Sequence, residues 1–181
     1  MHRRLPRVAW PLLGLAAGVA AAALLTLLQD ATYRADASVV LVREGQPPGD
    51  DPQLAAAAAA ASELFESRAV AASAIANLGL DESPDALVAR LDVAAEPESS
   101  LVRIEVDAPA REEARRAAQE VAEVATVLFN DRFGPRTVAS VWEPPGPDAV
   151  RVSPKPARNL VGGALAGALL GLLALAVGQA L

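Results

Sequence analysis

The sequence has no cysteine, which excludes disulfide bonds, a thiolate nucleophile and a metal site built on cysteine. Histidine occurs only at His2 and tyrosine only at Tyr33, so neither is expected to act as a base in the central segment. The acidic pairs Asp50-Asp51, Asp81-Glu82 and Glu112-Glu113 lie at predicted turns or helix starts, and we interpret them as capping or solvated groups. A serine without such a base is a poor nucleophile, and no glycine loop followed by Lys-Ser or Lys-Thr is present to hold a nucleotide. We therefore expect no catalytic residues, no cofactor and no bound metal, and we interpret the chain as a protein that is not an enzyme.

Charge is missing from both ends of the chain. Aromatic residues make up only 3% of it, whereas 52% is apolar, mostly alanine, leucine and valine. Neither residues 8–28 nor residues 160–181 contain a charged side chain. A helix of about 21 residues is roughly 32 Å long, enough to cross a hydrocarbon core of about 30 Å, so we predict two transmembrane helices. A cleaved secretory signal is the alternative for the first, although its apolar run exceeds the ~7–15 residues of a signal-peptide core.

The basic residues near these segments predict their orientation. Residues 1–7 contain three arginines and no acid, and the positive-inside tendency places this end in the cytoplasm. The second helix then returns the chain, so we expect both termini in the cytoplasm of a bacterial cell and the central residues outside its inner membrane. Two cations just before the second helix weakly oppose this orientation. The residues expected at the membrane interface are Arg3, Arg4, Arg7, Trp10, Lys155 and Arg158.

The central segment is acidic. It holds all 22 acidic residues and 13 basic ones, a net charge of −9. Such a segment is not expected to bind nucleic acid or anionic lipid. The membrane contact of this protein is therefore assigned to the lipid bilayer around its two apolar helices.

Alternating and helical patterns in the central segment predict a small α+β domain over residues 29–143. Its sheet is expected to be mainly antiparallel and to carry two long helices on one face. Strands are predicted at 35–42, 91–95, 101–107 and 137–142, and helices at 53–78, 84–90 and 110–133. Residues 44–52 are expected to form a loop, Gly79 to end the first long helix, and Asp107 to cap the last. The first long helix begins with seven alanines, for which a composition bias explains at least as much as a functional role.

Prolines and glycines follow a pattern beside and within the apolar segments. Residues 144–159 form a proline-rich return to the membrane, with Pro144, Pro145, Pro147, Pro154 and Pro156 favouring extended backbone. Small residues four apart let helix backbones approach closely in lipid. The glycines predicted to form such packing faces are Gly14 and Gly18 in the first helix and Gly163, Gly167 and Gly171 in the second. Either the two helices pair within one chain, or copies of the chain pair with each other.

The order of these segments resembles the polysaccharide co-polymerase family, the Wzz-type chain-length determinants and their capsular relatives. The residues that carry the resemblance are 37–42 (ASVVLV), 64–93 with its Leu-Gly-Leu, the strand and alanine-rich helix of 101–129, and the proline motif with the glycine-rich helix of 144–171. The resemblance is in the order of segments, since none of these motifs is diagnostic alone. A long protruding helix and a fused tyrosine kinase, which some members have, are not expected here.

The resemblance implies a membrane-anchored, non-catalytic scaffold that regulates chain length, polymerisation or export of an extracellular or capsular polysaccharide. It also implies a homo-oligomer with a polysaccharide polymerase or flippase as partner. A separate tyrosine kinase is a weaker candidate partner, because few residues follow Gly178. The alternative is an envelope adaptor or sensor whose external domain binds a protein or a cell-wall ligand.

Overall fold

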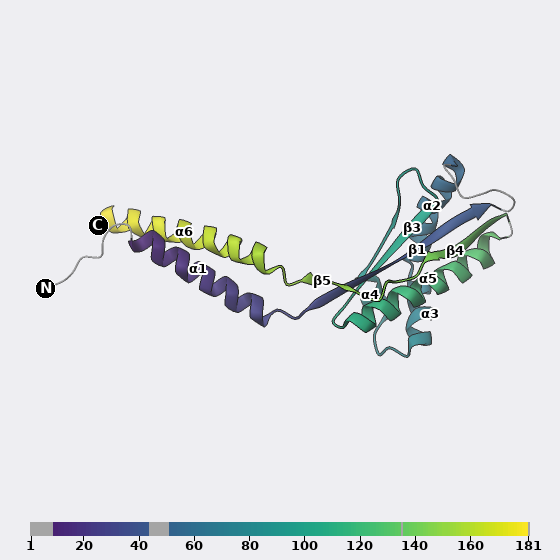
Figure 1. The fold of residues 1–181 in the computed structure, drawn as a ribbon, viewed down its shortest axis with the longest axis horizontal. Helices are drawn as coiled ribbons and strands as arrows, with labels where there is room; N and C mark the ends of the chain where they lie inside the picture. The colour runs from purple at the N-terminus through teal and green to yellow at the C-terminus, as the bar shows by residue number, and fades with distance from the viewer. Residues whose placement is uncertain (1–8, 44–50, 135, 181) are drawn as a thin grey trace. The chain divides into compact units, whose positions relative to one another are not determined.

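The computed structural model of the chain describes residues 9–43, 51–134 and 136–180, and these fall into two compact units. One unit consists of Thr32–Arg151, and the other joins the two ends of the chain, Met1–Ala31 and Val152–Leu181 (Figure 1). The three N-terminal arginines and most of the predicted loop at 44–52 lie outside the described residues. Each unit is described separately below.

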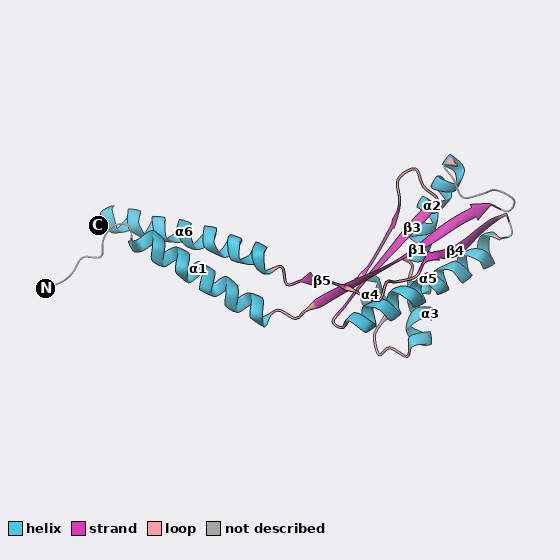
Figure 2. Cartoon of the chain, viewed as in Figure 1, coloured by secondary structure: helices cyan, strands magenta, loops and turns pink. Residues whose placement is uncertain are grey.

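The first of these units is built on an antiparallel sheet with the strand order β2-β3-β1-β4 (Figure 2). Its strands are β1 (Thr32–Arg43), β2 (Leu91–Ala95), β3 (Leu101–Ala108) and β4 (Thr137–Glu143), and a short strand β5 (Val150–Ser153) also pairs with β1. The predicted hairpin is confirmed, with Val93 opposite Ile104. The mixed α+β class and the antiparallel sheet are likewise as predicted, whereas β5 was not foreseen.

Helices cover one face of the sheet, as the alternation of β3 requires. Val102, Ile104 and Val106 are fully buried, whereas the side chains between them are partly exposed. Helices α2 (Pro52–Phe65), α4 (Pro84–Val88) and α5 (Arg111–Phe133) contact the strands, and α3 (Arg68–Leu78) packs on α4 and α5. Phe65 of α2 and Phe129 of α5 meet edge to face, with ring centroids 6.1 Å apart, which is a favourable aromatic geometry.

The alanine tract has a packing role on α2. Leu54, Ala58, Ala61 and Phe65 recur at spacings of four, three and four residues and are all buried. Their recurrence forms one apolar stripe on the helix, and the small alanines let the helix lie close to the structure beneath it. Ala58 and Ala61 of the tract therefore belong to the buried core.

The prediction of one long helix over residues 53–78 is wrong. The chain breaks after Phe65, and the Ser67 hydroxyl accepts a hydrogen bond from the backbone N–H of Val70 to begin a second helix. A serine hydroxyl at this position satisfies an N–H group that the helix itself leaves unpaired. Gly79 ends the second helix in the left-handed region at φ 65°, as predicted. The described part of the Thr32–Arg151 unit therefore contains one long helix, α5, instead of the two predicted.

Asp107 does not cap α5, contrary to the sequence prediction. The helix is preceded by Ala110, which makes no side-chain capping bond. The Asp107 carboxylate instead accepts two hydrogen bonds from Arg34 on the neighbouring strand. The Asp107 carboxylate pairs with Arg34 instead of capping α5 because Arg34 lies directly opposite Asp107 in the register of β1 and β3, where side chains on one face are neighbours.

The second unit contains the two apolar helices, α1 (Ala9–Leu28) and α6 (Pro156–Ala180). Both are long and apolar enough to cross a membrane. The last helix starts at Pro156, four residues before the predicted boundary, because proline with its fixed φ is well suited to a first helical position. The predicted extended return is therefore shorter than residues 144–159 and includes β5.

Candidate functional site: a glycine seam between two apolar helices

The two apolar helices pack along each other in opposite directions. Gly14 lies against Gly167 and Gly171, whereas Gly18, one turn further along α1, lies against Gly163 and Gly167. Rising numbers on α1 thus meet falling numbers on α6, which makes the pair antiparallel. The structure brings together all five glycines that the sequence singled out, and it does so within one chain.

Backbones touch at these positions, and no side chain would fit between them. A Cβ atom placed on Gly14 would lie 2.9 Å from the Gly171 Cα, and one on Gly18 would lie 2.8 Å from the Gly167 Cα. Real Cβ atoms essentially never come so close to another heavy atom. Such close approach maximises van der Waals contact, which is the main attraction between helices where water is absent. We call these five positions, Gly14, Gly18, Gly163, Gly167 and Gly171, the glycine seam.

The seam continues beyond the glycines to a polar contact. Ala22, four residues after Gly18, packs on Gly163. At the next step of four, Asn159 donates its side-chain amide to the Thr26 hydroxyl at 3.1 Å and to the side-chain Oε1 of Gln29 at 3.2 Å. These residues were not singled out from the sequence. The signal was present, because Gly14, Gly18, Ala22 and Thr26 share one spacing of four, as do Asn159 and the three seam glycines of α6.

A groove of about 750 Å³ runs beside the glycine seam. Small residues widen it, because they leave space where larger side chains would fill the surface between two helices. It is lined by Ala17, Ala21, Gly162 and Ala166 together with every seam glycine except Gly171, and Gln29, Arg158 and Asn159 also border it. Leucines instead dominate the exposed side chains elsewhere on both helices.

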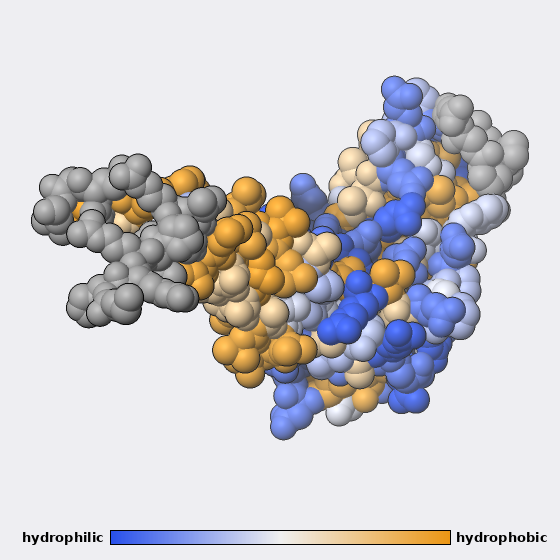
Figure 3. Space-filling view, turned by 60° about the vertical axis from the view of Figure 1, so that its left-hand side comes forward, coloured by the Kyte–Doolittle hydropathy of each residue, from blue (hydrophilic) through white to orange (hydrophobic). Residues whose placement is uncertain are grey.

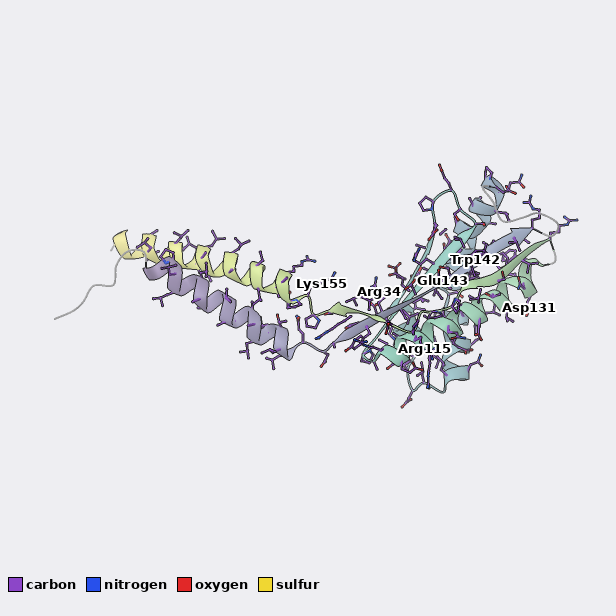
Figure 4. All side chains as sticks on the ribbon, viewed as in Figure 1. Arg34, Arg115, Asp131, Trp142, Glu143 and Lys155 are labelled. Carbon is purple, nitrogen blue, oxygen red and sulfur yellow. The ribbon has the colours of Figure 1, made fainter. Side chains whose placement is uncertain are left out.

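The residues predicted for the membrane interface and the return segment differ in their exposure. Lys155 is exposed just before α6 (Figure 4). Arg158 is exposed in the first turn of that helix. Trp10 lies in α1. Of the five prolines, Pro145 and Pro154 are buried, whereas Pro144, Pro147 and Pro156 are exposed.

The surfaces of the two units differ in character. Figure 3 shows hydrophobic side chains over the described part of the helix pair and mostly hydrophilic ones over Thr32–Arg151. None of the acidic or basic side chains that the structure describes is fully buried. The apolar surface of α1 and α6 matches a lipid environment, whereas the other unit has the polar surface of a domain in water.

Charged side chains on the uncovered face of the sheet are paired with one another. The Arg34 guanidinium donates to both oxygens of Asp107, at 2.7 and 2.8 Å, and to Glu105 at 2.5 Å. The hydrogen bond to Asp107, with the charges of Asp107 and Glu105, raises the pKa of Arg34 above its ordinary range. Likewise, the hydrogen bond to Glu96 raises the pKa of Arg103. These arginines and carboxylates neutralise each other's charge, and we interpret the pairs as groups that stabilise the sheet.

No group of three or more His, Cys, Asp or Glu side chains that could hold a metal ion occurs in residues 9–43, 51–134 and 136–180. A strongly shifted carboxyl pKa is found at Glu112, at the exposed start of α5. Hydrogen bonds from Arg115 and Arg116 lower the pKa of Glu112 to about 2. A carboxylate held in its charged form on an open helix surface is suited to pairing with arginines, and it is poorly suited to giving or taking a proton near neutral pH.

No protein-family model matches the chain, and no curated protein matches it.

Proposed function

We propose that this protein is a membrane-anchored, non-catalytic scaffold that regulates chain length, polymerisation or export of an extracellular or capsular polysaccharide. The observation that carries the proposal is the antiparallel packing of α1 and α6 along the glycine seam. It makes the two ends of the chain into one anchor. The acidic α+β unit of Thr32–Arg151 would be the functional domain that this anchor holds at the membrane.

The polar end of the helix pair supports this topology. Asn159, near the start of α6, bonds to Thr26 and Gln29 at the end of α1, so the chain leaves and re-enters the pair at the same end. In a bilayer, residues 30–155 would then emerge on one side, and both termini would lie on the other. The three arginines of residues 1–7 favour the cytoplasm for the termini.

The order of the elements along the chain supports the proposal. An apolar helix is followed by a long strand, helices, a hairpin, a long helix and a proline-rich return into a glycine-rich helix. The charged side chains of the sheet are engaged with one another, which suits a scaffold better than a reaction centre. A polysaccharide polymerase or a flippase is the partner that the resemblance suggests.

The helix packing refines the proposed oligomer. Because the glycine seam is filled within one chain, copies of the protein have to meet through other surfaces. A scaffold of this kind would act by holding several external domains side by side near its partner. The pair of helices α1 and α6 would only fix each domain to the membrane.

Deleting the gene in a bacterium that encodes this chain tests the proposal. Surface polysaccharide from the deletion strain, separated on a gel, should change in amount or in length distribution, and the full chain supplied in trans should restore the original pattern. An unchanged pattern would contradict the proposal. If the polysaccharide is unchanged while the protein copurifies with a transporter or sensor, the adaptor function is favoured instead.

A further inference from the structure

The sheet of the α+β unit has two outer strands in its main order, β2 and β4. An outer strand offers unpaired N–H and C=O groups to any other strand, so proteins shorten, charge or cover such edges. Strand β2 has only five residues. Strand β4 has seven, and its sequence TVASVWE contains no proline, no basic residue and no acid before Glu143. Strand β4 therefore lacks the proline and the basic residues that protect an edge strand from pairing with another strand.

A side chain covers the middle of this edge. The side-chain amide of Asn130 donates to the backbone carbonyl of Ala139 at 3.0 Å, and its carbonyl accepts from the backbone N–H of Ala139 at 2.8 Å. Because both backbone groups of Ala139 bond to Asn130, they point away from β1. They are the groups that an incoming strand would use, and a carboxamide presents the same donor and acceptor as a peptide unit.

The position of Asn130 is fixed by the end of α5. The preceding residue, Phe129, is buried and packs against Phe65 and Phe133. The backbone carbonyl of Asn130 accepts a hydrogen bond of 2.9 Å from the N–H of Gly134, where the helix ends. The side chain is therefore held against β4 by the core and by the helix end. It is not a mobile surface group.

We propose that Asn130 is a built-in block on strand addition, and that the edge it covers would otherwise pair with β4 of a second copy of this chain. A second copy is the fitting occupant because two identical antiparallel strands satisfy each other's backbone groups around a two-fold axis. No charge between Thr137 and Trp142 opposes this pairing. Trp142, which is 61% exposed on β4, would lose water-exposed surface in such a contact. The inference is independent of the polysaccharide proposal.

The test uses the full chain in lipid nanodiscs, with S140C labelled by pyrene. The chain has no other cysteine, and Ser140 is exposed on β4. Excimer emission requires two pyrenes in contact and so reports pairing of two β4 strands. In N130A the emission should rise several-fold above the wild-type background. Q119A is the matched control, because Gln119 also lies on α5 but its amide bonds only to exposed Glu123, and it should leave the emission unchanged.

Hydrogen exchange of the Ala139 amide separates the outcomes. Slow exchange together with excimer emission in N130A supports the block. Rapid exchange without excimer emission would show an open edge that no strand joins, and would overturn the proposal. If circular dichroism shows that N130A is unfolded, N130D is used in its place. Aspartate keeps the acceptor for the Ala139 N–H but loses the donor to the Ala139 carbonyl. Excimer emission in N130D no higher than in wild type would then also overturn it.

Discussion

Gly18 of α1 and Gly163 of α6 face each other so closely that neither position can carry a side chain. A Cβ atom on Gly163 would lie 2.6 Å from the Gly18 carbonyl oxygen, and a Cβ on Gly18 would come still closer to the Gly163 carbonyl oxygen. Each glycine therefore lies against the backbone of the other. This contact shows that the glycine face of α1 packs on the glycine face of α6, whereas the spacing of the glycines alone did not show which surfaces meet.

Replacing Gly163 with leucine should separate the two helices. The added side chain would collide with Ala22 and with the Gly18 backbone, and backbone cannot give way as a flexible side chain can. The neighbouring change Gly162→Leu is the matched control, because a Cβ there meets nothing within 4 Å. Migration on SDS gels, which is sensitive to the compactness of helical hairpins, should shift for G163L and stay at the wild-type position for G162L. Equal migration of both variants would contradict the packing.

The Asn159 contact should contribute a modest free energy to the helix pair. Hydrogen bonds between helices in membranes contribute about 0.6 kcal/mol on average and up to about 1.7 kcal/mol. A double-mutant cycle of Thr26→Val and Asn159→Leu, measured by SDS-induced unfolding in mixed micelles, should give a coupling in this range. The reason is that Asn159 donates directly to the Thr26 hydroxyl. A coupling of zero would show that the two side chains do not meet.

The Arg34–Asp107 pair should stabilise the α+β unit only slightly. Its geometry is bidentate, but the Arg34 side chain is 36% exposed, so water screens the attraction. A cycle of Arg34→Met and Asp107→Asn should give a coupling of about 1 kcal/mol in urea unfolding of the full chain in detergent. Raising the salt concentration should reduce that coupling. A salt-independent coupling would indicate that packing, and not charge, holds the pair.

Glu112 should titrate near pH 2, well below its ordinary pKa of 4.5, because Arg115 and Arg116 donate to its carboxylate. A carboxyl group with a lowered folded-state pKa contributes stability above pH 4.5, and this contribution is lost as the pH falls from about 4.5 to 2. Carbon-13 NMR of the Glu112 carboxyl should show this, and the double change Arg115→Ala with Arg116→Ala should return the pKa toward 4.5. An unchanged pKa in the double variant would exclude the two arginines as the cause.

Local patterns predicted much of the sheet. The alternation of residues 101–107 and the polar turn before it correctly indicated a hairpin, because one face of a strand must be buried. The break at Ser67 was missed because the flanking residues favour helix almost throughout, and this propensity hid a capping serine. Asp107 was assigned to a helix cap because its partner, Arg34, is 73 residues away in sequence.

The candidate site shows the same division between local and long-range information. A spacing of four predicted the glycine faces, but small residues fit any closely approaching backbone, so the sequence left the partner open. The contact of Asn130 with Ala139 could not be predicted at all. It depends on how α5 ends and how β4 turns back beside it, and neither is encoded in the type of the two residues.

The pairing of α1 and α6 within one chain is the central claim, and a disulfide tests it most directly. Thr26 and Asn159 are in contact, and the chain has no native cysteine, so T26C and N159C can be combined without other thiols. In membranes treated with a mild oxidant, the double variant should form an internal disulfide and run as a monomer on a non-reducing gel. A mixture of the two single variants should not cross-link. Dimers from that mixture, with no internal disulfide in the double variant, would contradict the account.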